Sequence, residues 1–306
     1  MSVASKPSGR PRGFAPLDYA LYAIAVLVWG LSWIALHYQV GEVAPEVSIV
    51  WRFAISAPLM LAFAAWHGER LAFDLADHVH FAALGAAIFS TNYALFYYAG
   101  VTIASGLLSI VFSLAAIGNV ALGSLIFGTR IEGRVVVGAA FGVLGVALMF
   151  YPELGGLRFD SGVLGGLALS LGGTLCFCLG NMLSLAAQRK GLPIFATIGW
   201  GMVYGVVVMA LVALLRGERF AVEWSATYLG GLIYLSVLGS VLAFGVYFTL
   251  LGRIGAARAG YSTVMYPVIA LVASTFAENY RWSVLAVLGL AAVLAGNLLV
   301  LRAPKR

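Results

Sequence analysis

The pattern of hydrophobic and polar positions divides the chain into ten long apolar segments separated by short polar loops. These segments are rich in Leu, Ala and Gly and do not alternate, which favours helices over the strands of a membrane barrel. A helix that crosses a bilayer needs roughly 17–25 apolar residues. The long charge-free stretch 78–129 must therefore hold two helices, with a break near Gly100. The predicted spans are 17–38, 47–66, 79–99, 103–126, 134–151, 162–187, 193–214, 226–250, 257–276 and 283–301.

The last five segments resemble the first five in order and spacing. Both the third and the eighth carry aromatic residues at positions i, i+3 and i+4, starting at Tyr93 and at Phe244. Because five is an odd number, the second copy must enter the membrane from the opposite side. We therefore predict an all-α polytopic membrane protein with ten transmembrane helices in two inverted five-helix repeats. The predicted divisions are a cytoplasmic tail at 1–16, a first repeat at 17–151, an extracytoplasmic linker at 152–161, a second repeat at 162–302 and a tail at 303–306.

Composition and charge agree with a membrane protein. Hydrophobic residues make up 62% of the chain and charged residues only 10%, whereas a soluble domain is about 25% charged. The net charge of +6 does not indicate nucleic-acid binding, because the basic residues are dispersed over many loops. Thirteen of the 18 Lys and Arg residues fall on one side of the predicted topology, and such an excess marks the cytoplasmic side. We therefore expect both termini in the cytoplasm and the protein in a bacterial inner membrane.

Short motifs along the chain carry a resemblance to a known family. They are Trp29–Trp33 in the first segment, Trp51–Phe53 in the second, Phe96–Gly100 closing the third, Tyr266–Pro267 in the ninth and Glu278–Asn279 after it. In these motifs the chain resembles the drug/metabolite transporter superfamily, specifically the ten-helix EamA-type permeases. Within that group it looks most similar to the YddG-type exporters of aromatic and other amino acids. The second half matches the family pattern better than the first.

The resemblance implies a transporter of small metabolites that works by alternating access around a central cavity. We expect the cavity among segments one, three, four, six, eight and nine, and the preferred substrates to be aromatic and other apolar amino acids. An exporter of drug-like cations or nucleotide-derived metabolites is the alternative within the superfamily. A channel is a further rival, and would conduct without saturation. A membrane-embedded enzyme would need a His or carboxylate deep in a span beside its nucleophile, and the sequence offers none. We therefore expect no catalytic residues and no enzyme.

Polar and aromatic residues inside the spans are the candidates for holding a substrate, because an unpaired polar group facing lipid is costly. The alternative for each is hydrogen bonding or packing between helices. No Asp, Glu, Lys or Arg lies deep in a predicted span, which favours facilitated exchange over proton coupling. The candidate substrate-binding residues are Trp33, Asn92, Tyr93, Phe96, Tyr97, Ser109, Phe112, Asn181, Trp200, Tyr204, Phe244, Tyr247, Tyr261 and Tyr266.

Three residues are candidates for a hinge or a structural kink: Gly30, Gly180 and Pro267. Small residues spaced along the fifth and tenth segments predict close helix packing there, so we expect these two helices to be scaffold. The sequence shows no metal-binding cluster and no motif for a cofactor, and we expect neither. The expected partners are a small-molecule substrate and the lipid bilayer, with the protein as a monomer and no nucleic acid.

Overall fold

The computed structural model describes residues 15–41, 43–128, 133–153, 161–254 and 261–301, and within these ranges all regular structure is helical. Each of the ten predicted spans is present, and the break predicted near Gly100 separates α4 from α5. The first half contains α1 (Pro16–His37), α2 (Pro45–Trp66), α3 (Leu75–Ala86), η1 (Ala87–Asn92), α4 (Tyr93–Ala99), α5 (Ser105–Ser113), α6 (Ala115–Phe127) and α7 (Gly133–Glu153). The second contains α8 (Ser161–Arg189), α9 (Ile194–Leu215), α10 (Ala226–Ile233), η2 (Tyr234–Leu242), α11 (Ala243–Ile254), α13 (Tyr261–Ala277) and α14 (Val284–Leu301).

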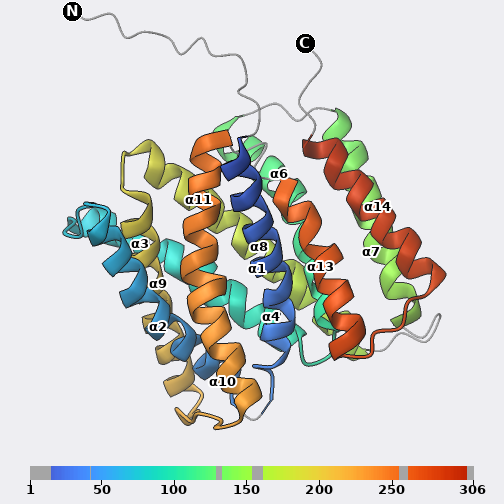
Figure 1. Ribbon diagram of the computed structural model, residues 1–306, viewed down its shortest axis with the longest axis horizontal. Coiled ribbons are helices and arrows are strands. Elements are labelled where there is room, and N and C mark those ends of the chain that lie inside the picture. The colour runs from blue at the N-terminus through green and yellow to red at the C-terminus, as the bar shows by residue number, and fades with distance from the viewer. Residues whose placement is uncertain (1–14, 42, 129–132, 154–160, 255–260, 302–306) are drawn as a thin grey trace, which may run out of the picture.

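Length and hydropathy qualify most of these helices to cross a bilayer. Among the described residues, 7 helical stretches reach at least 18 residues with sufficient hydropathy, and shorter apolar helices lie at Val136–Pro152, Met265–Ala277 and Val284–Leu299. Figure 1 shows the helices packed as one bundle, with the start of α1 and the end of α14 on the same side. The predicted class, an all-α polytopic membrane protein of two inverted five-helix repeats, is confirmed.

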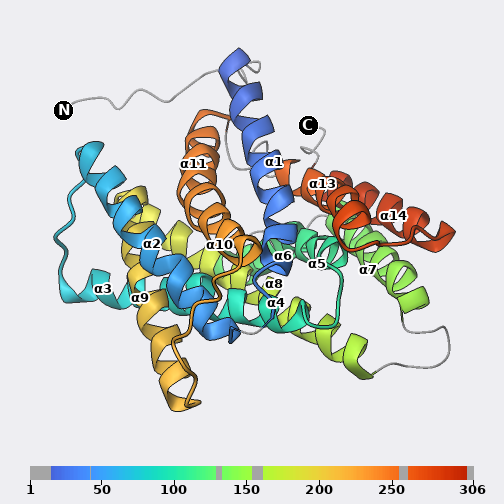
Figure 2. The ribbon, with the colours of Figure 1, turned by 60° about the horizontal axis from the view of Figure 1, so that its bottom comes forward.

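The helix contacts follow the symmetry of the repeat. Three pairs join a helix to its own counterpart in the other half, namely α2 with α9, α5 with α13, and α7 with α14. Other contacts occur in both halves: α1 packs on α11, and its counterpart α8 packs on α4. Figures 1 and 2 both show α7 and α14 side by side at one end of the bundle. A two-fold axis between the halves requires this arrangement.

Close packing of α7 on α14 depends on glycine. A Cβ atom added to Gly145 would lie 2.5 Å from the carbonyl oxygen of Gly289, and one added to Gly296 would lie 2.5 Å from that of Gly138. Any side chain there would force the two backbones apart. The close packing predicted for the fifth and tenth segments from their small residues is therefore confirmed.

Two helices contain a π-helical stretch at equivalent places in the repeat. The stretch η1 lies between α3 and α4, and η2 lies between α10 and α11, so each interrupts the third helix of its half. Such stretches are rare and occur frequently at functional sites, because they leave carbonyl groups outside the regular hydrogen-bond pattern. Both lie just before the aromatic positions that the sequence shares between the halves, which directs attention to this part of the bundle.

Carboxylates join several helix ends across the bundle. Glu278, after α13, accepts hydrogen bonds from the backbone N–H (3.1 Å) and hydroxyl (2.5 Å) of Ser105 at the start of α5, and lies 3.0 Å from His37. Glu69, after α2, accepts a 2.7 Å bond from the N–H of Ala196 in the first turn of α9. An anion is favourable at the positive end of a helix dipole. These contacts fix α5 and α9 against helices of the other repeat.

Candidate functional site

Aromatic side chains of α1 reach into both halves of the bundle. The ring of Trp29 lies 5.2 Å from Phe244 and 5.1 Å from Tyr247 on α11, and 5.7 Å from Tyr266 on α13. Edge and tilted geometries at these separations are favourable for aromatic pairs. One indole thus joins three of the predicted site residues, and these four residues are called the Trp29 cluster below.

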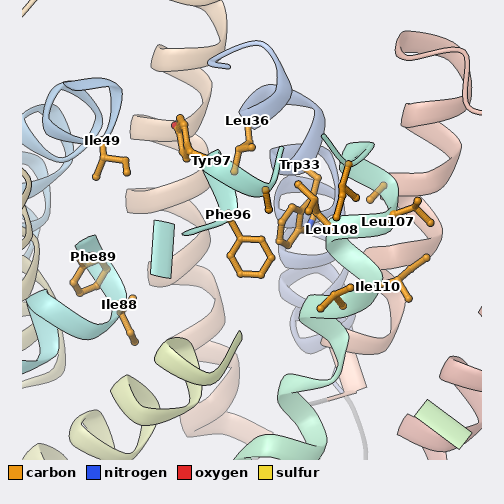
Figure 3. Packing of buried hydrophobic residues seen from close by; sticks show 14 of the residues in the cluster. Trp33, Leu36, Ile49, Ile88, Phe89, Phe96, Tyr97, Leu107, Leu108 and Ile110 are labelled. Carbon is orange, nitrogen blue, oxygen red and sulfur yellow. The ribbon is translucent and has the colours of Figure 1, made fainter. Parts of the chain in front are cut away.

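A second aromatic group lies one turn further along α1. The ring of Trp33 is 5.1 Å from Phe96 on α4 and 5.4 Å from Phe112 on α5, and Phe112 is 4.7 Å from Phe177 on α8. Figure 3 shows Phe96 and Trp33 close together, while Tyr97 points the other way. The two groups bring α1, α4, α5, α8, α11 and α13 together, which are the six segments expected to surround a substrate.

The π-helix η2 connects the aromatic groups to a polar one. The indole N–H of Trp29 donates a 3.0 Å hydrogen bond to the carbonyl oxygen of Gly239. At the next residue, the hydroxyl of Ser240 accepts a 3.1 Å bond from Nε of Arg52. The same hydroxyl donates to the carbonyl oxygen of Leu235 at 2.9 Å. Because the Ser240 hydroxyl donates its proton to Leu235, its oxygen is free to act as the acceptor for Arg52.

Arg52 is the most unusual residue of the site. It lies in the second turn of α2, roughly 10 Å from the start of that helix, and its relative exposure is 2%. Its guanidinium stacks 4.3 Å from the ring centroid of Tyr93 and 5.3 Å from that of Phe53. Nη2 also donates to the Tyr93 hydroxyl at 3.3 Å. Among the described residues, no carboxylate lies within 4 Å of this guanidinium.

The expectation that charged residues avoid the interior of the bundle is wrong. Besides Arg52, the side chains of Glu46, Asp18 and Glu278 are buried. Glu46 accepts a short hydrogen bond from the hydroxyl of Tyr98 and pairs with Arg216 at 3.3 Å. Position near a helix end does not mean exposure here, because neighbouring helices cover those ends. The argument against proton coupling from a lack of buried charge therefore falls.

Two buried hydroxyl groups in this part of the bundle lack a hydrogen-bond acceptor, and one of them lies beside Arg52. The Tyr97 side chain is fully buried, and its hydroxyl is next to the guanidinium without an acceptor for its own proton. The Ser236 hydroxyl is likewise buried and unpaired, one turn of η2 before Ser240. Buried polar groups are nearly always hydrogen-bonded. A buried hydroxyl without an acceptor, beside a guanidinium without a carboxylate, is a property expected of a binding site.

Three of the polar candidates are used in bonds within the bundle. The amide of Asn92 donates a 2.7 Å hydrogen bond to the carbonyl oxygen of Gly173 on α8, and that of Asn181 donates a 3.1 Å bond to the side chain of Asn119 on α6. The Ser109 hydroxyl donates at 2.5 Å to the carbonyl three residues earlier in α5. These contacts match the packing alternative, so a role of these residues in substrate binding stays a prediction.

Two aromatic candidates belong to a separate group at the α3 end of α9. Trp200 donates from its indole to the carbonyl oxygen of Leu71 at 3.0 Å, and its ring lies 4.7 Å from that of His78. The Tyr204 hydroxyl is hydrogen-bonded to the same histidine at 3.1 Å. Neither residue joins the Trp29 cluster. Tyr261 begins α13, and its side chain lies outside the described residues.

The three hinge candidates lie inside continuous helices. Both glycines are sites of close approach: a Cβ at Gly30 would lie 2.6 Å from Cβ of Ile269, and one at Gly180 would lie 2.1 Å from a side-chain carbon of Ile88. Pro267 lies within α13, which runs through it. The two glycines are thus required for packing in this conformation, and movement at any of the three positions stays a prediction.

The structure adds three residues to the site that sequence reasoning omitted: Trp29, Arg52 and Ser240. Trp29 stands four residues before Trp33, so both project from one face of α1, and this spacing was readable. An arginine five residues inside a predicted span is itself a signal, because such residues face the bundle interior. Ser240 carried no signal, since its role depends on the local π-helix.

The comparisons with known proteins agree with this architecture. The chain matches the EamA-like transporter family twice, over residues 18–151 and 164–302. The chain belongs to the EamA-like transporter family. Like other members, it is a multi-pass membrane transporter built from two EamA repeats. The two matched ranges correspond to the two halves of the helix contact pattern.

Curated relatives of this EamA transporter are distant but span nearly its full length. It is 22% identical over 288 residues to a "probable amino-acid metabolite efflux pump" of Escherichia coli K12, covering 91% of this chain and 93% of the relative. It is 25% identical over 297 residues to the "uncharacterized inner membrane transporter YedA" of the same strain, covering 93% and 92%. One solved crystal structure shares the fold, with a TM-score of 0.67 at 18% identity and coverage of 92% and 95%.

Proposed function

We propose that this EamA transporter exports aromatic and other apolar amino acids across a bacterial inner membrane. In this proposal the substrate binds among the six central helices, and the two repeats rock against each other to expose it to each side in turn. Both termini are then cytoplasmic. The relative named as an amino-acid metabolite efflux pump supports the substrate class.

The observation that carries the proposal is the Trp29 cluster. Its four rings come from three helices and both halves of the chain, so relative movement of the halves changes the surface that they form together. Aromatic surfaces of this kind favour flat or apolar side chains. Alternating access needs a binding surface shared between repeats, and this cluster has that property.

The alternative substrate class, drug-like cations, is disfavoured by the charge of the site. Aromatic rings alone would suit a flat cation through cation–π contact. The buried guanidinium of Arg52 binds in the same η2 turn as the Trp29 indole, without a carboxylate beside it among the described residues. A second positive charge brought there would be repelled at low dielectric. A neutral, zwitterionic or anionic substrate avoids this cost.

The test is counterflow in liposomes. Purified protein in vesicles loaded with unlabelled amino acid is expected to take up external labelled tryptophan or phenylalanine, and uptake is expected to saturate with concentration. Conductance without saturation would indicate a channel instead. A complete lack of exchange with all amino acids would overturn the substrate assignment.

Replacing Trp29 by Ala tests the cluster directly. The change removes the ring that contacts Phe244, Tyr247 and Tyr266, and is expected to lower counterflow of tryptophan about tenfold, since one lost aromatic contact with the substrate contributes about 0.5–1.5 kcal/mol. Trp66→Ala is the matched control, because Trp66 is 81% exposed at the end of α2. Equal exchange rates in the two variants would remove the Trp29 cluster from the binding surface.

A further inference from the structure

We propose that Arg52 is the anion-binding residue of the substrate site and takes the carboxylate of the transported molecule. The inference rests on the proposed function and adds a named recognition group to it. Within the described residues the positive charge of Arg52 has no carboxylate within 4 Å, although the residue is 2% exposed.

A guanidinium in this position is costly without an anion. Charged side chains inside a membrane protein pair with an opposite charge or mark a substrate pathway. Two of the five N–H donors of Arg52 are used, by the hydroxyls of Ser240 and Tyr93. Neutral hydroxyls orient the side chain and leave its charge uncompensated. The planar fork of donors matches a carboxylate, which it binds through two parallel hydrogen bonds.

Tyr97 provides a second observation at the same place. Its hydroxyl is completely buried, lies beside the Arg52 guanidinium, and has no acceptor for its own proton. A buried tyrosine that serves only packing is expected to have a hydrogen-bond acceptor for its hydroxyl, because an unsatisfied buried donor lowers the stability of the fold. A carboxylate held by Arg52 gives this hydroxyl an acceptor. A bound carboxylate would thus neutralise the charge of Arg52 and also accept a hydrogen bond from Tyr97.

The position of Arg52 relative to the Trp29 cluster suits a particular kind of molecule. Gly239 receives the indole N–H of Trp29, and the adjacent Ser240 receives Nε of Arg52. The guanidinium and the aromatic surface are therefore held by consecutive residues of η2. A molecule that carries a carboxylate next to an apolar or aromatic group can contact both at once, as aromatic α-amino acids do.

The test compares matched substrates with and without a carboxylate. Counterflow is measured with tryptophan and tryptamine, and with phenylalanine and phenethylamine, in the native protein, Arg52→Gln and Arg52→Lys. Arg52→Gln is expected to lose about 100-fold in kcat/KM for the two carboxylates, because a charge-assisted pair is removed. Arg52→Lys, which keeps the charge without the fork, is expected to recover part of this loss. Arg70→Gln is the control, since that arginine has a 62% exposed side chain.

Tyr97→Phe covers the case in which Arg52 variants fail to fold. It removes only a hydroxyl whose proton has no acceptor within the protein, so the melting temperature in detergent is expected to change little, while KM for tryptophan rises about tenfold. Tyr38→Phe, at the exposed C-terminal end of α1, is the matched control. An unchanged KM in Tyr97→Phe and unchanged carboxylate exchange in Arg52→Gln would overturn the anion site.

The outcomes separate this inference from the proposed function. Amino-acid exchange that is equal in the native protein and Arg52→Gln keeps the function and rejects the anion site. Exchange of indole-3-propionate that depends on Arg52, with no exchange of any amino acid, keeps the anion site and rejects amino acids as the substrates.

Discussion

At the scale of single residues, the structure separates polar groups that hold the bundle together from those that lack a partner. The amides of Asn92 and Asn181 each donate to a neighbouring helix, so their hydrogen-bonding capacity is used within the protein. The Tyr97 hydroxyl is buried and has no such partner. Burial alone does not distinguish the two kinds of polar group, whereas the presence or absence of a hydrogen-bond acceptor does.

Asn92→Ala is expected to act on stability. The change removes a 2.7 Å bond to the Gly173 carbonyl, which links the third helix of the first half to α8, and such a bond inside a membrane protein contributes roughly 1 kcal/mol. Thermal unfolding in detergent should show a lower midpoint, with KM for tryptophan unchanged. Thr91→Ala, one residue earlier and exposed, provides the comparison. A raised KM at unchanged stability would return Asn92 to the substrate site.

At the scale of elements, the two π-helices repeat one detail at an equal spacing. The Ser90 hydroxyl donates to the carbonyl of Gly85, and the Ser240 hydroxyl donates to the carbonyl of Leu235, in each case five residues earlier. Both halves therefore support the widened turn in the same way. In the second half the widened turn also carries the bonds to Trp29 and Arg52, so η2 shapes the site directly.

Deleting one residue from η2 is expected to be tolerated by the fold and harmful to transport. A π-helical stretch accommodates an extra residue, so removing Val237, which is 38% exposed, restores a regular helix without rotating the segments around it. The bonds from Trp29 and Arg52 are then lost. Monodisperse elution in detergent with counterflow at background level is the expected result.

The control for this deletion is removal of Val207 from the regular helix α9, where the side chain is 47% exposed. This change rotates one end of α9 against its neighbours by about 100° and is expected to prevent folding. Normal transport after deletion of Val237 would show that the π-helix is not needed.

At the scale of the whole molecule, the helix contacts define two equivalent halves related by a two-fold axis. α2 packs on α9 and α5 on α13, so matching helices meet across the centre. Carboxylates after α2 and α13 bind the starts of α9 and α5 in the opposite half. These contacts at the helix ends join the two halves to each other.

The orientation of this body in the membrane is predicted by the thirteen basic residues on one side. Green fluorescent protein fused after Arg306 is expected to fluoresce, because it folds in the cytoplasm. Alkaline phosphatase fused at the same place is expected to be inactive, and one inserted after Gly217 is expected to be active. The reverse pattern would place both termini outside.

Much of the architecture was predictable from the sequence, and the chemistry of the site was less so. Bilayer thickness sets the helix lengths, so all ten spans follow from hydropathy. Half of the aromatic site follows from the shared spacing that starts at Tyr93 and Phe244. The burial of Arg52 depends on which helices cover α2, and the role of Ser240 depends on a π-helix in a stretch of ordinary apolar composition. Both are properties of three-dimensional packing.

The glycine contacts between α7 and α14 have a consequence for how such a chain arises. Gly138 of the first repeat corresponds to Gly289 of the second, and Gly145 corresponds to Gly296. The close contacts pair Gly145 with Gly289 and Gly138 with Gly296. Exchanging the two repeats therefore turns one contact into the other. Reciprocal contact of this kind defines an isologous interface. Two identical five-helix subunits in antiparallel orientation would make this contact from a single surface, so α7 and α14 meet within one polypeptide as the two sides of a symmetric dimer interface do.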